Sequence, residues 1–156
     1  MSEQRQPTLL VIEDERLVRR SVMRLAGQQG FRTVGVPTAE EGLEMLDRES
    51  IDVVLVDQGL PGRLQGVDFI REARKGWPTL DYVLFTGEGD VSVGYAALEQ
   101  GASDYFTKPI QDSQRFAQVL RRGVEARRLR EENAHLHRRA VQGEGQVERL
   151  LLGHSV

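Results

Sequence analysis

The stretch that decides the fold is IDVVLVDQGLPG, residues 51–62. Residues 51–56 form a short apolar run rich in β-branched side chains, and a turn containing glycine and proline follows, which is typical of a strand. Because this run is apolar on both faces, the strand is expected to be covered on both sides. Asp57 then lies at the carboxyl end of a buried strand.

Similar strand patterns recur before and after this stretch and alternate with helical patterns. The expected strands are 8–12, 32–36, 51–56, 81–85 and 104–107, and the expected helices are 15–29, 39–47, 67–75, 91–100 and a long one from about residue 113. Thr38 and Glu41 are expected to form a capping box, and Gly30 and Gly101 to end helices in the left-handed conformation. The alternation predicts an α/β fold with a doubly wound, five-stranded parallel sheet.

Composition excludes several classes of protein. The 156 residues suit one domain with an extension. No apolar run approaches the roughly 20 residues of a membrane helix, so a cytoplasmic protein is expected. The absence of cysteine removes thiolate catalysis and cysteine zinc sites. The three histidines have no metal-ligand spacing, and a net charge of −3 gives no general attraction to nucleic acid.

Polar residues follow the predicted strands at the edge where ligands of such sheets bind. They are Glu13, Asp14, Asp57, Thr86 and Lys108. Three converging carboxylates repel one another unless a cation joins them, and hard oxygen ligands suit Mg²⁺. A carboxylate in such a site can attack phosphorus. Asp57, at the end of the central strand, is the expected nucleophile, and Lys108 and Thr86 are expected to contact the phosphoryl oxygens.

The segments VIEDE (11–15), VLVDQGLPG (54–62), LFTGEG (84–89) and GASDYFTKPI (101–110) together resemble the receiver domain of two-component response regulators. This resemblance covers residues 8–123 and implies a flavodoxin-like sheet of order 2-1-3-4-5. It implies a non-enzymatic phosphoprotein that receives a phosphoryl group on Asp57 from a histidine kinase or phosphotransfer protein. It also implies a cis peptide bond between Lys108 and Pro109.

The resemblance assigns further roles at the same edge. Asp14 would bind Mg²⁺ directly, Glu13 largely through water, and the backbone carbonyl of Gly59 would complete the protein ligands. Thr86 would sense the phosphoryl group and Tyr105 would be the switch aromatic, although an aromatic at this place is also common as plain core. Gly59 and Glu88 would flank the path of attacking water. The loop 62–65, GRLQ, is one residue longer than the usual pattern.

The last quarter of the chain differs in character, because arginine is frequent and no helix breaker occurs before Gly143. A heptad register has Val119, Ala126, Asn133 and Ala140 at position a, and Arg122, Leu129, Leu136 and Gly143 at position d. We therefore expect a parallel homodimer through a short coiled coil, with Glu125 opposite Arg130 of the other copy. A single exposed helix with (i, i+4) ion pairs is the alternative.

The expected organisation is a receiver domain at 1–123, a helical linker at 124–142 and a tail at 143–156 that begins a missing output domain. Gly143 and Gly145 are expected to end the helix. The tail weakly resembles the start of the ATPase module in sigma-54-activator-type regulators. Direct contact of the arginine-rich helix with nucleic acid is disfavoured, because glutamates are interleaved and stacking aromatics are missing.

Three alternative functions make different demands on the residues at this edge of the sheet. A Mg²⁺-dependent phosphohydrolase would turn over substrate, but Gly59 replaces the Asp usual two residues beyond the nucleophile. A nucleotide or flavin domain would need glycines or hydroxyls after the first strand, where this chain has Glu-Asp-Glu. A phosphate-independent dimerisation scaffold would not need Asp57, Thr86 and Lys108.

Overall fold

The computed structural model of the chain describes residues 5–87 and 91–155, with side chains as far as residue 142. The strands are β1 (Thr8–Ile12), β2 (Arg32–Val36), β3 (Val53–Asp57), β4 (Asp81–Thr86) and β5 (Asp104–Thr107), and the helices are α1 (Arg16–Gln28), α2 (Ala39–Arg48), α3 (Gly66–Gly76), α4 (Val91–Glu99) and α5 (Ser113–Ser155). All five strands are parallel, in the order β2-β1-β3-β4-β5. The predicted flavodoxin-like α/β fold is confirmed.

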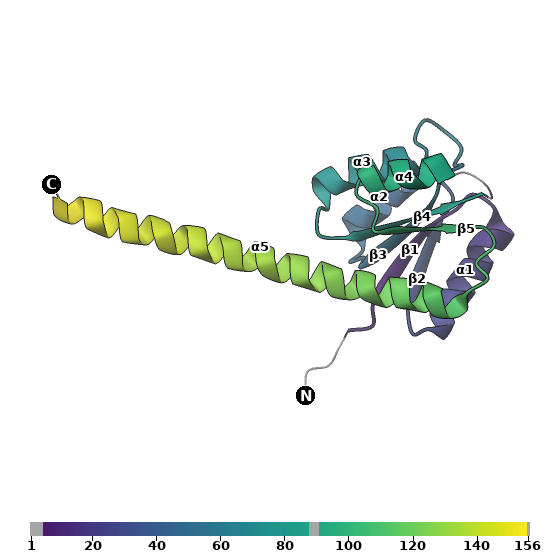
Figure 1. Cartoon of the computed structure of the whole chain (residues 1–156), viewed down its shortest axis with the longest axis horizontal. Coiled ribbons are helices and arrows are strands. Elements are labelled where there is room, and N and C mark those ends of the chain that lie inside the picture. The colour runs from purple at the N-terminus through teal and green to yellow at the C-terminus, as the bar shows by residue number, and fades with distance from the viewer. Residues whose placement is uncertain (1–4, 88–90, 156) are drawn as a thin grey trace.

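Helices cover both faces of the sheet (Figure 1), and an apolar cluster lies on each face. One core cluster joins the sheet to α2, α3 and α4, and the other joins it to α1 and to Phe116, Val119 and Leu120 of α5. All five residues of β1 and of β3 are buried. This explains why their sequences are apolar on both faces rather than alternating.

The helix and strand ends follow the predicted signals with local differences. Gly30 and Gly101 have φ values of 93° and 108°, and the Lys108–Pro109 bond is cis. Thr38 accepts a hydrogen bond from the Glu41 backbone N–H, but the reciprocal capping box is found at α3, between Gln65 and Asp68. The third strand begins at Val53 instead of residue 51, and the Asp52 carboxylate just before it accepts the backbone N–H of Thr8.

The prediction that α5 ends at Gly143 and Gly145 is wrong. The helix continues to Ser155 and is 43 residues, or about 65 Å, long. A glycine inside a helix costs only about 1 kcal/mol relative to alanine, and Gln, Glu, Arg and Leu around the two glycines are favourable helix residues. The linker therefore projects far beyond the receiver as one continuous helix (Figure 1).

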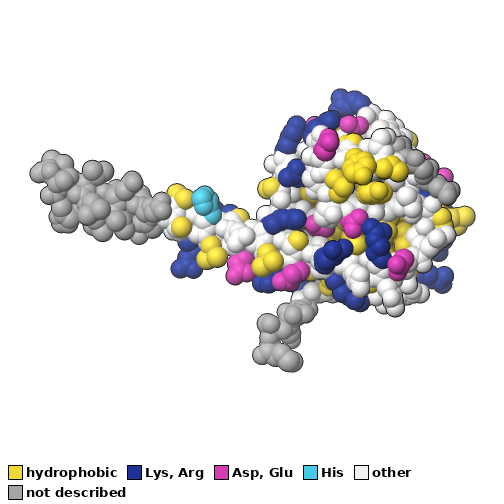
Figure 2. All heavy atoms as spheres, in the orientation of Figure 1, with side chains coloured by type: hydrophobic (Ala, Val, Ile, Leu, Met, Phe, Trp, Pro, Cys, Tyr) yellow, Lys and Arg dark blue, Asp and Glu magenta, His cyan; other side chains and the backbone are white. Residues whose placement is uncertain are grey.

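The contact between α5 and the rest of the chain extends beyond Val124, which packs against the apolar core. Polar contacts to the receiver continue as far as Glu131. Beyond this point Leu136 and Val141 are exposed. Figure 2 shows hydrophobic side chains on the surface of the part of α5 that leaves the receiver. Among the residues that the structure describes, no helix has the length and apolarity needed to cross a membrane.

Candidate functional site

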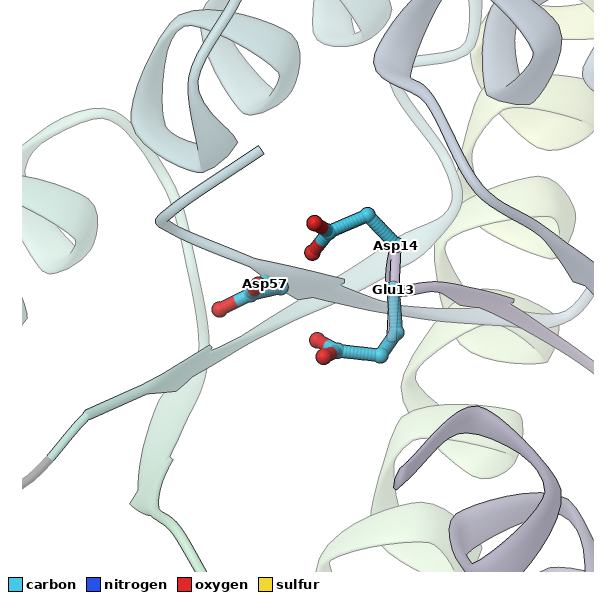
Figure 3. Close-up of side chains that lie close together, drawn as sticks. All are labelled: Glu13, Asp14 and Asp57. Carbon is cyan, nitrogen blue, oxygen red and sulfur yellow. The ribbon is translucent and has the colours of Figure 1, made fainter. Parts of the chain in front are cut away.

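Three carboxylates converge at the carboxyl edge of the sheet, as predicted. Glu13 and Asp14 directly follow β1, and Asp57 ends the neighbouring strand β3. One carboxylate oxygen of each residue lies within 4.8 Å of those of the other two. Figure 3 shows the Glu13 and Asp14 side chains extending from the end of β1 toward Asp57. Glu13 and Asp57 are buried whereas Asp14 is exposed, so the cluster opens to solvent on the Asp14 side.

Lys108 forms ion pairs with both buried carboxylates. Its Nζ lies 2.9 Å from Glu13 Oε2 and 3.0 Å from Asp57 Oδ1, and 5.0 Å from the centre of the Phe85 ring. The backbone N–H of Lys108 donates to the carbonyl of Thr86, which fixes the start of the loop after β5. The ammonium group is therefore held by both neighbouring strand ends and by an aromatic face.

The pKa values of Glu13 and Lys108 are both shifted by their surroundings in the cluster. Burial raises the pKa of Glu13 to about 7, the neighbouring Asp57 adds to the rise, and Lys108 opposes it. Burial alone would lower the pKa of Lys108, but hydrogen bonds to Glu13 and Asp57 outweigh that effect and the pKa is raised. Lys108 is thus held in its charged form, whereas burial beside Asp57 shifts Glu13 toward its protonated form despite the ion pair.

Thr86 and Tyr105 lie on the neighbouring strands β4 and β5. Thr86 is buried at the end of β4, and Tyr105 is half-buried, in register with Leu84 two residues before Thr86. Side chains two residues apart share a sheet face, so Thr86 and Tyr105 belong to the same face. A Cβ added to Gly94 of α4 would lie 2.9 Å from the Tyr105 ring, so this glycine makes room for the ring.

Local hydrogen bonds order the loop after β3, which was expected to be one residue longer than usual. Gly62 has a φ of 93°, and the Gln65 side chain donates to the Leu60 carbonyl while it caps α3. The Gly59 backbone N–H donates to Asp57 Oδ1 at 3.3 Å, which places this residue beside the cluster. Glu88, expected to flank the water path, lies outside the described residues.

Three further residues support the site and were not predicted. Phe85 lies under the Lys108 ammonium, and Arg19 donates to the Glu13 carbonyl at 2.8 Å. A Cβ on Gly66 would lie 2.6 Å from the Asp57 carbonyl oxygen, so α3 approaches the end of β3 very closely. A glycine at the first position of a helix after a long loop is the sequence signal for such an approach.

Comparison with known proteins agrees with this geometry. The family model described as "Response regulator receiver domain" matches residues 9–121. The two-component response regulator PhoP of Pseudomonas aeruginosa is 38% identical over 103 residues, which cover 66% of this chain and 45% of that protein. The C4-dicarboxylate transport transcriptional regulatory protein DctD of Rhizobium meliloti is 32% identical over 134 residues, covering 86% of this chain and 29% of that protein.

Solved structures give the same match. A response regulator receiver domain protein from Clostridium thermocellum has a TM-score of 0.73 and 29% identity, covering 79% of this chain and 98% of that one. NtrX from Brucella abortus in complex with ATP has a TM-score of 0.77 and 28% identity, covering 85% of this chain and 30% of that one. DctD and NtrX are NtrC-like activators, the type of regulator that the tail resembles. The chain spans about half or less of the length of PhoP and DctD.

Proposed function

We propose that this chain, which belongs to the response regulator receiver family, takes a phosphoryl group on Asp57 from a histidine kinase or phosphotransfer protein in a Mg²⁺-dependent reaction. The observation that carries the proposal is the ion pair between Lys108 and Asp57 beside Glu13 and Asp14. Phosphoryl transfer to a carboxylate uses a nucleophile, a fixed cation and further carboxylates that can hold a metal ion. This cluster has all three kinds of group.

The acidic cluster fits a magnesium ion by its chemistry. Receiver domains bind Mg²⁺ at an acidic pocket, and here three carboxylates supply hard oxygen atoms within 4.8 Å of one another. We assign Asp14 and Asp57 as direct ligands, the Gly59 carbonyl as a third, and Glu13 as a ligand through water. When bound, the ion would neutralise charge on the transferred phosphoryl oxygens.

In the proposed transfer, a carboxylate oxygen of Asp57 attacks the phosphorus atom of a phosphohistidine. The new P–O bond forms as the P–N bond breaks, and the electron pair stays on the imidazole nitrogen, which takes a proton. The Lys108 ammonium, 3.0 Å from Asp57 Oδ1, stabilises the negative charge that accumulates on the phosphoryl oxygens. The hydroxyl of Thr86 donates a hydrogen bond to one of these oxygens.

The signal would then pass through Tyr105 and α5. Movement of the Thr86 hydroxyl toward the phosphoryl group frees space on the shared sheet face, and Tyr105 rotates inward. Support comes from the register of the two strands and from Gly94, which leaves the ring room against α4. Such a switch works because the phosphoryl group contacts Thr86 better in the arrangement that leaves space for the inward ring.

We further propose that α5 joins two copies in a parallel coiled coil that positions an output domain. Leu129 and Leu136 support this proposal, because they are 47% and 51% exposed on a helix that leaves the receiver. Glu125 and Arg130, expected to pair between copies, each have a partner in their own chain, Arg128 and Asp81. The dimer is thus expected to depend on the leucines.

The transfer is tested by intact mass spectrometry after incubation with acetyl phosphate and Mg²⁺. One phosphoryl group should be added, addition should stop when EDTA removes the metal, and Asp57→Asn should abolish it. Asp47→Asn, at an exposed position of α2, is the control and should behave like the unchanged chain. Repeated release of phosphate without a stable adduct would favour a phosphohydrolase, and full labelling of Asp57→Asn would refute the assignment.

A further inference from the structure

Two buried carboxylates lie at the amino edge of the sheet, opposite the edge that carries Asp57. Asp52 directly precedes β3 and is 7% exposed, and Asp81 begins β4 and is 2% exposed. They are the acidic side chains next to Val53, whose Cα pairs with that of Asp81. A buried carboxylate is costly unless it is paired and hydrogen-bonded, so the partners of these two residues are important for the fold.

Their arginine partners come largely from α5. Arg127 Nη1 lies 2.8 Å from Asp52 Oδ1, and Arg130 Nη1 lies 3.3 Å from Asp81 Oδ1 while it donates to the Leu80 carbonyl at 3.1 Å. The Arg127 side chain is only 16% exposed. These contacts, termed here the amino-edge ion pairs, lie beyond the apolar contact of α5 with the sheet.

A neighbouring contact lies on the same face of the helix. The Thr79 hydroxyl donates to Glu131 at 3.2 Å, and Glu131 also pairs with Arg127 at 2.9 Å. Residues three and four apart lie on one face of a helix, so Arg127, Arg130 and Glu131 form a continuous polar face toward the receiver. By contrast, Arg128 pairs with Glu125 and Glu132 of α5 itself.

Gly123 of α5 lies close to the same amino edge of the sheet. A Cβ on this residue would lie 2.6 Å from Asp81 Oδ2 and 2.9 Å from Val53 Cγ2. Glycine is among the poorest residues inside a helix, so its presence at this position is explained by the close approach of α5 to the amino edge. The backbone of α5 is therefore fitted to the same carboxylate that Arg130 contacts.

Other donors also contact the two carboxylates. Asp52 accepts from Arg5 and from the Thr8 N–H, and Asp81 accepts from the Ser103 hydroxyl. Loss of Arg127 would thus leave Asp52 with a cation, whereas loss of Arg130 would leave Asp81 with a neutral donor. Because each arginine contacts a different carboxylate, a variant must change both to release α5 from the amino edge.

We propose that the amino-edge ion pairs fix the direction in which the linker leaves the receiver, so that residues 113–142 move with the sheet as one body. Each of β3 and β4 then has a residue of the phosphoryl site at its carboxyl end and a helix-positioning carboxylate at its amino end. This inference goes beyond the proposed function, because the ion pairs hold the helix whether or not Asp57 accepts a phosphoryl group.

The test measures the distance between two spin labels by pulsed electron resonance on the full chain. Because the chain has no cysteine, labels can be attached through Asp47→Cys in α2 and His137→Cys in α5, both at exposed positions. Labelled chain is diluted with unlabelled chain, so that any dimer contributes no distance between copies. We expect one narrow distance maximum, and Arg127→Gln with Arg130→Gln should cause its loss in favour of a broad distribution.

Arg128→Gln with Arg138→Gln is the matched control, because it removes the same charge from exposed positions of the same helix. It should retain the narrow maximum. Circular dichroism identifies an unfolded variant. In that case Gly123→Ala provides the test, because its methyl group would push α5 away from Asp81, and it should also lose the narrow maximum. A broad distribution in the unchanged chain, or the same narrow maximum in every folded variant, would overturn the proposal.

Discussion

Asp52 and Asp57 flank the same buried strand, β3, and each is paired with a cation from a later part of the chain. Asp52 contacts Arg127 of the linker helix, and Asp57 contacts Lys108 of the loop after β5. The five residues from Val53 to Asp57 are all buried, and they span about 17 Å at roughly 3.3 Å per residue. A single rigid element therefore separates the proposed phosphoryl site from the contact that holds the helix.

Replacement of Lys108 by methionine should destabilise the chain without Mg²⁺ and make Mg²⁺ more stabilising. The change leaves three close carboxylates without their ammonium partner, and we expect a loss of about 1–3 kcal/mol, moderated by the partial exposure of Lys108. Thermal unfolding in EDTA and in Mg²⁺ measures both effects. Lys75→Met, which removes an exposed ion pair on α3, is the control. An unchanged response of Lys108→Met to Mg²⁺ would contradict this account.

Thr86→Ala should still accept a phosphoryl group but should lose the response of Tyr105. The smaller side chain occupies the same place in β4 yet lacks the hydroxyl that would move toward the phosphoryl oxygens. NMR signals of the Tyr105 ring, recorded with and without fluoroberyllate as a phosphoryl mimic, measure the response. Gly94→Ala is a second test, because its Cβ would displace the ring before any ligand is added. A ring environment that fluoroberyllate leaves unchanged in the parent chain would disprove the switch.

Gly123→Ala should destabilise the chain even though alanine favours a helix by about 1 kcal/mol. The added methyl group would contact Asp81 and Val53, which are both buried, and such overpacking costs about 1–3 kcal/mol. Gly27→Ala is the matched control, since this glycine of α1 has no atom within 4 Å of an added Cβ. Urea unfolding should move in opposite directions for the two variants. Equal stabilisation by both would show that α5 tolerates a side chain at this contact.

The chain should sediment as a dimer at micromolar concentrations, and Leu129→Glu with Leu136→Glu should yield a monomer. Both leucines are exposed on the protomer, and charges at these positions would oppose burial between helices. His135→Glu with Gln142→Glu places the same charges at other heptad positions and should leave the dimer intact. A monomer for the parent chain at all concentrations tested would leave α5 as a single helix with its observed (i, i+4) ion pairs.

The sheet and the acidic cluster were predictable because both follow from local patterns. Apolar runs define the strands, parallel strands bring their carboxyl ends to one edge, and polar residues at those ends must then meet. Glu13, Asp14, Asp57 and Lys108 come together for this reason. Their assigned roles go further than this geometry and remain predictions.

The amino edge and the full length of α5 were not predictable in the same way. Asp52 and Asp81 resemble ordinary polar residues at strand starts, and their arginine partners lie 75 and 49 positions away in sequence. Gly143 and Gly145 indicate a helix end by local preference, but the surrounding sequence sustains the helix to Ser155. The amino edge depends on ion pairs between residues far apart in sequence, and the length of α5 depends on the helix propensities summed over many turns.

The central claim is that Asp57 is the phosphoryl acceptor, and reductive trapping followed by peptide mapping tests it most directly. Borohydride reduces an aspartyl phosphate to the alcohol, so the side chain of an acceptor aspartate becomes that of homoserine. After treatment with acetyl phosphate and Mg²⁺, we predict this conversion at Asp57, with Asp14, Asp52 and Asp81 unchanged, and its loss when the metal is chelated. Conversion at another aspartate with Asp57 intact, or no conversion in a folded chain containing Mg²⁺, would contradict the account.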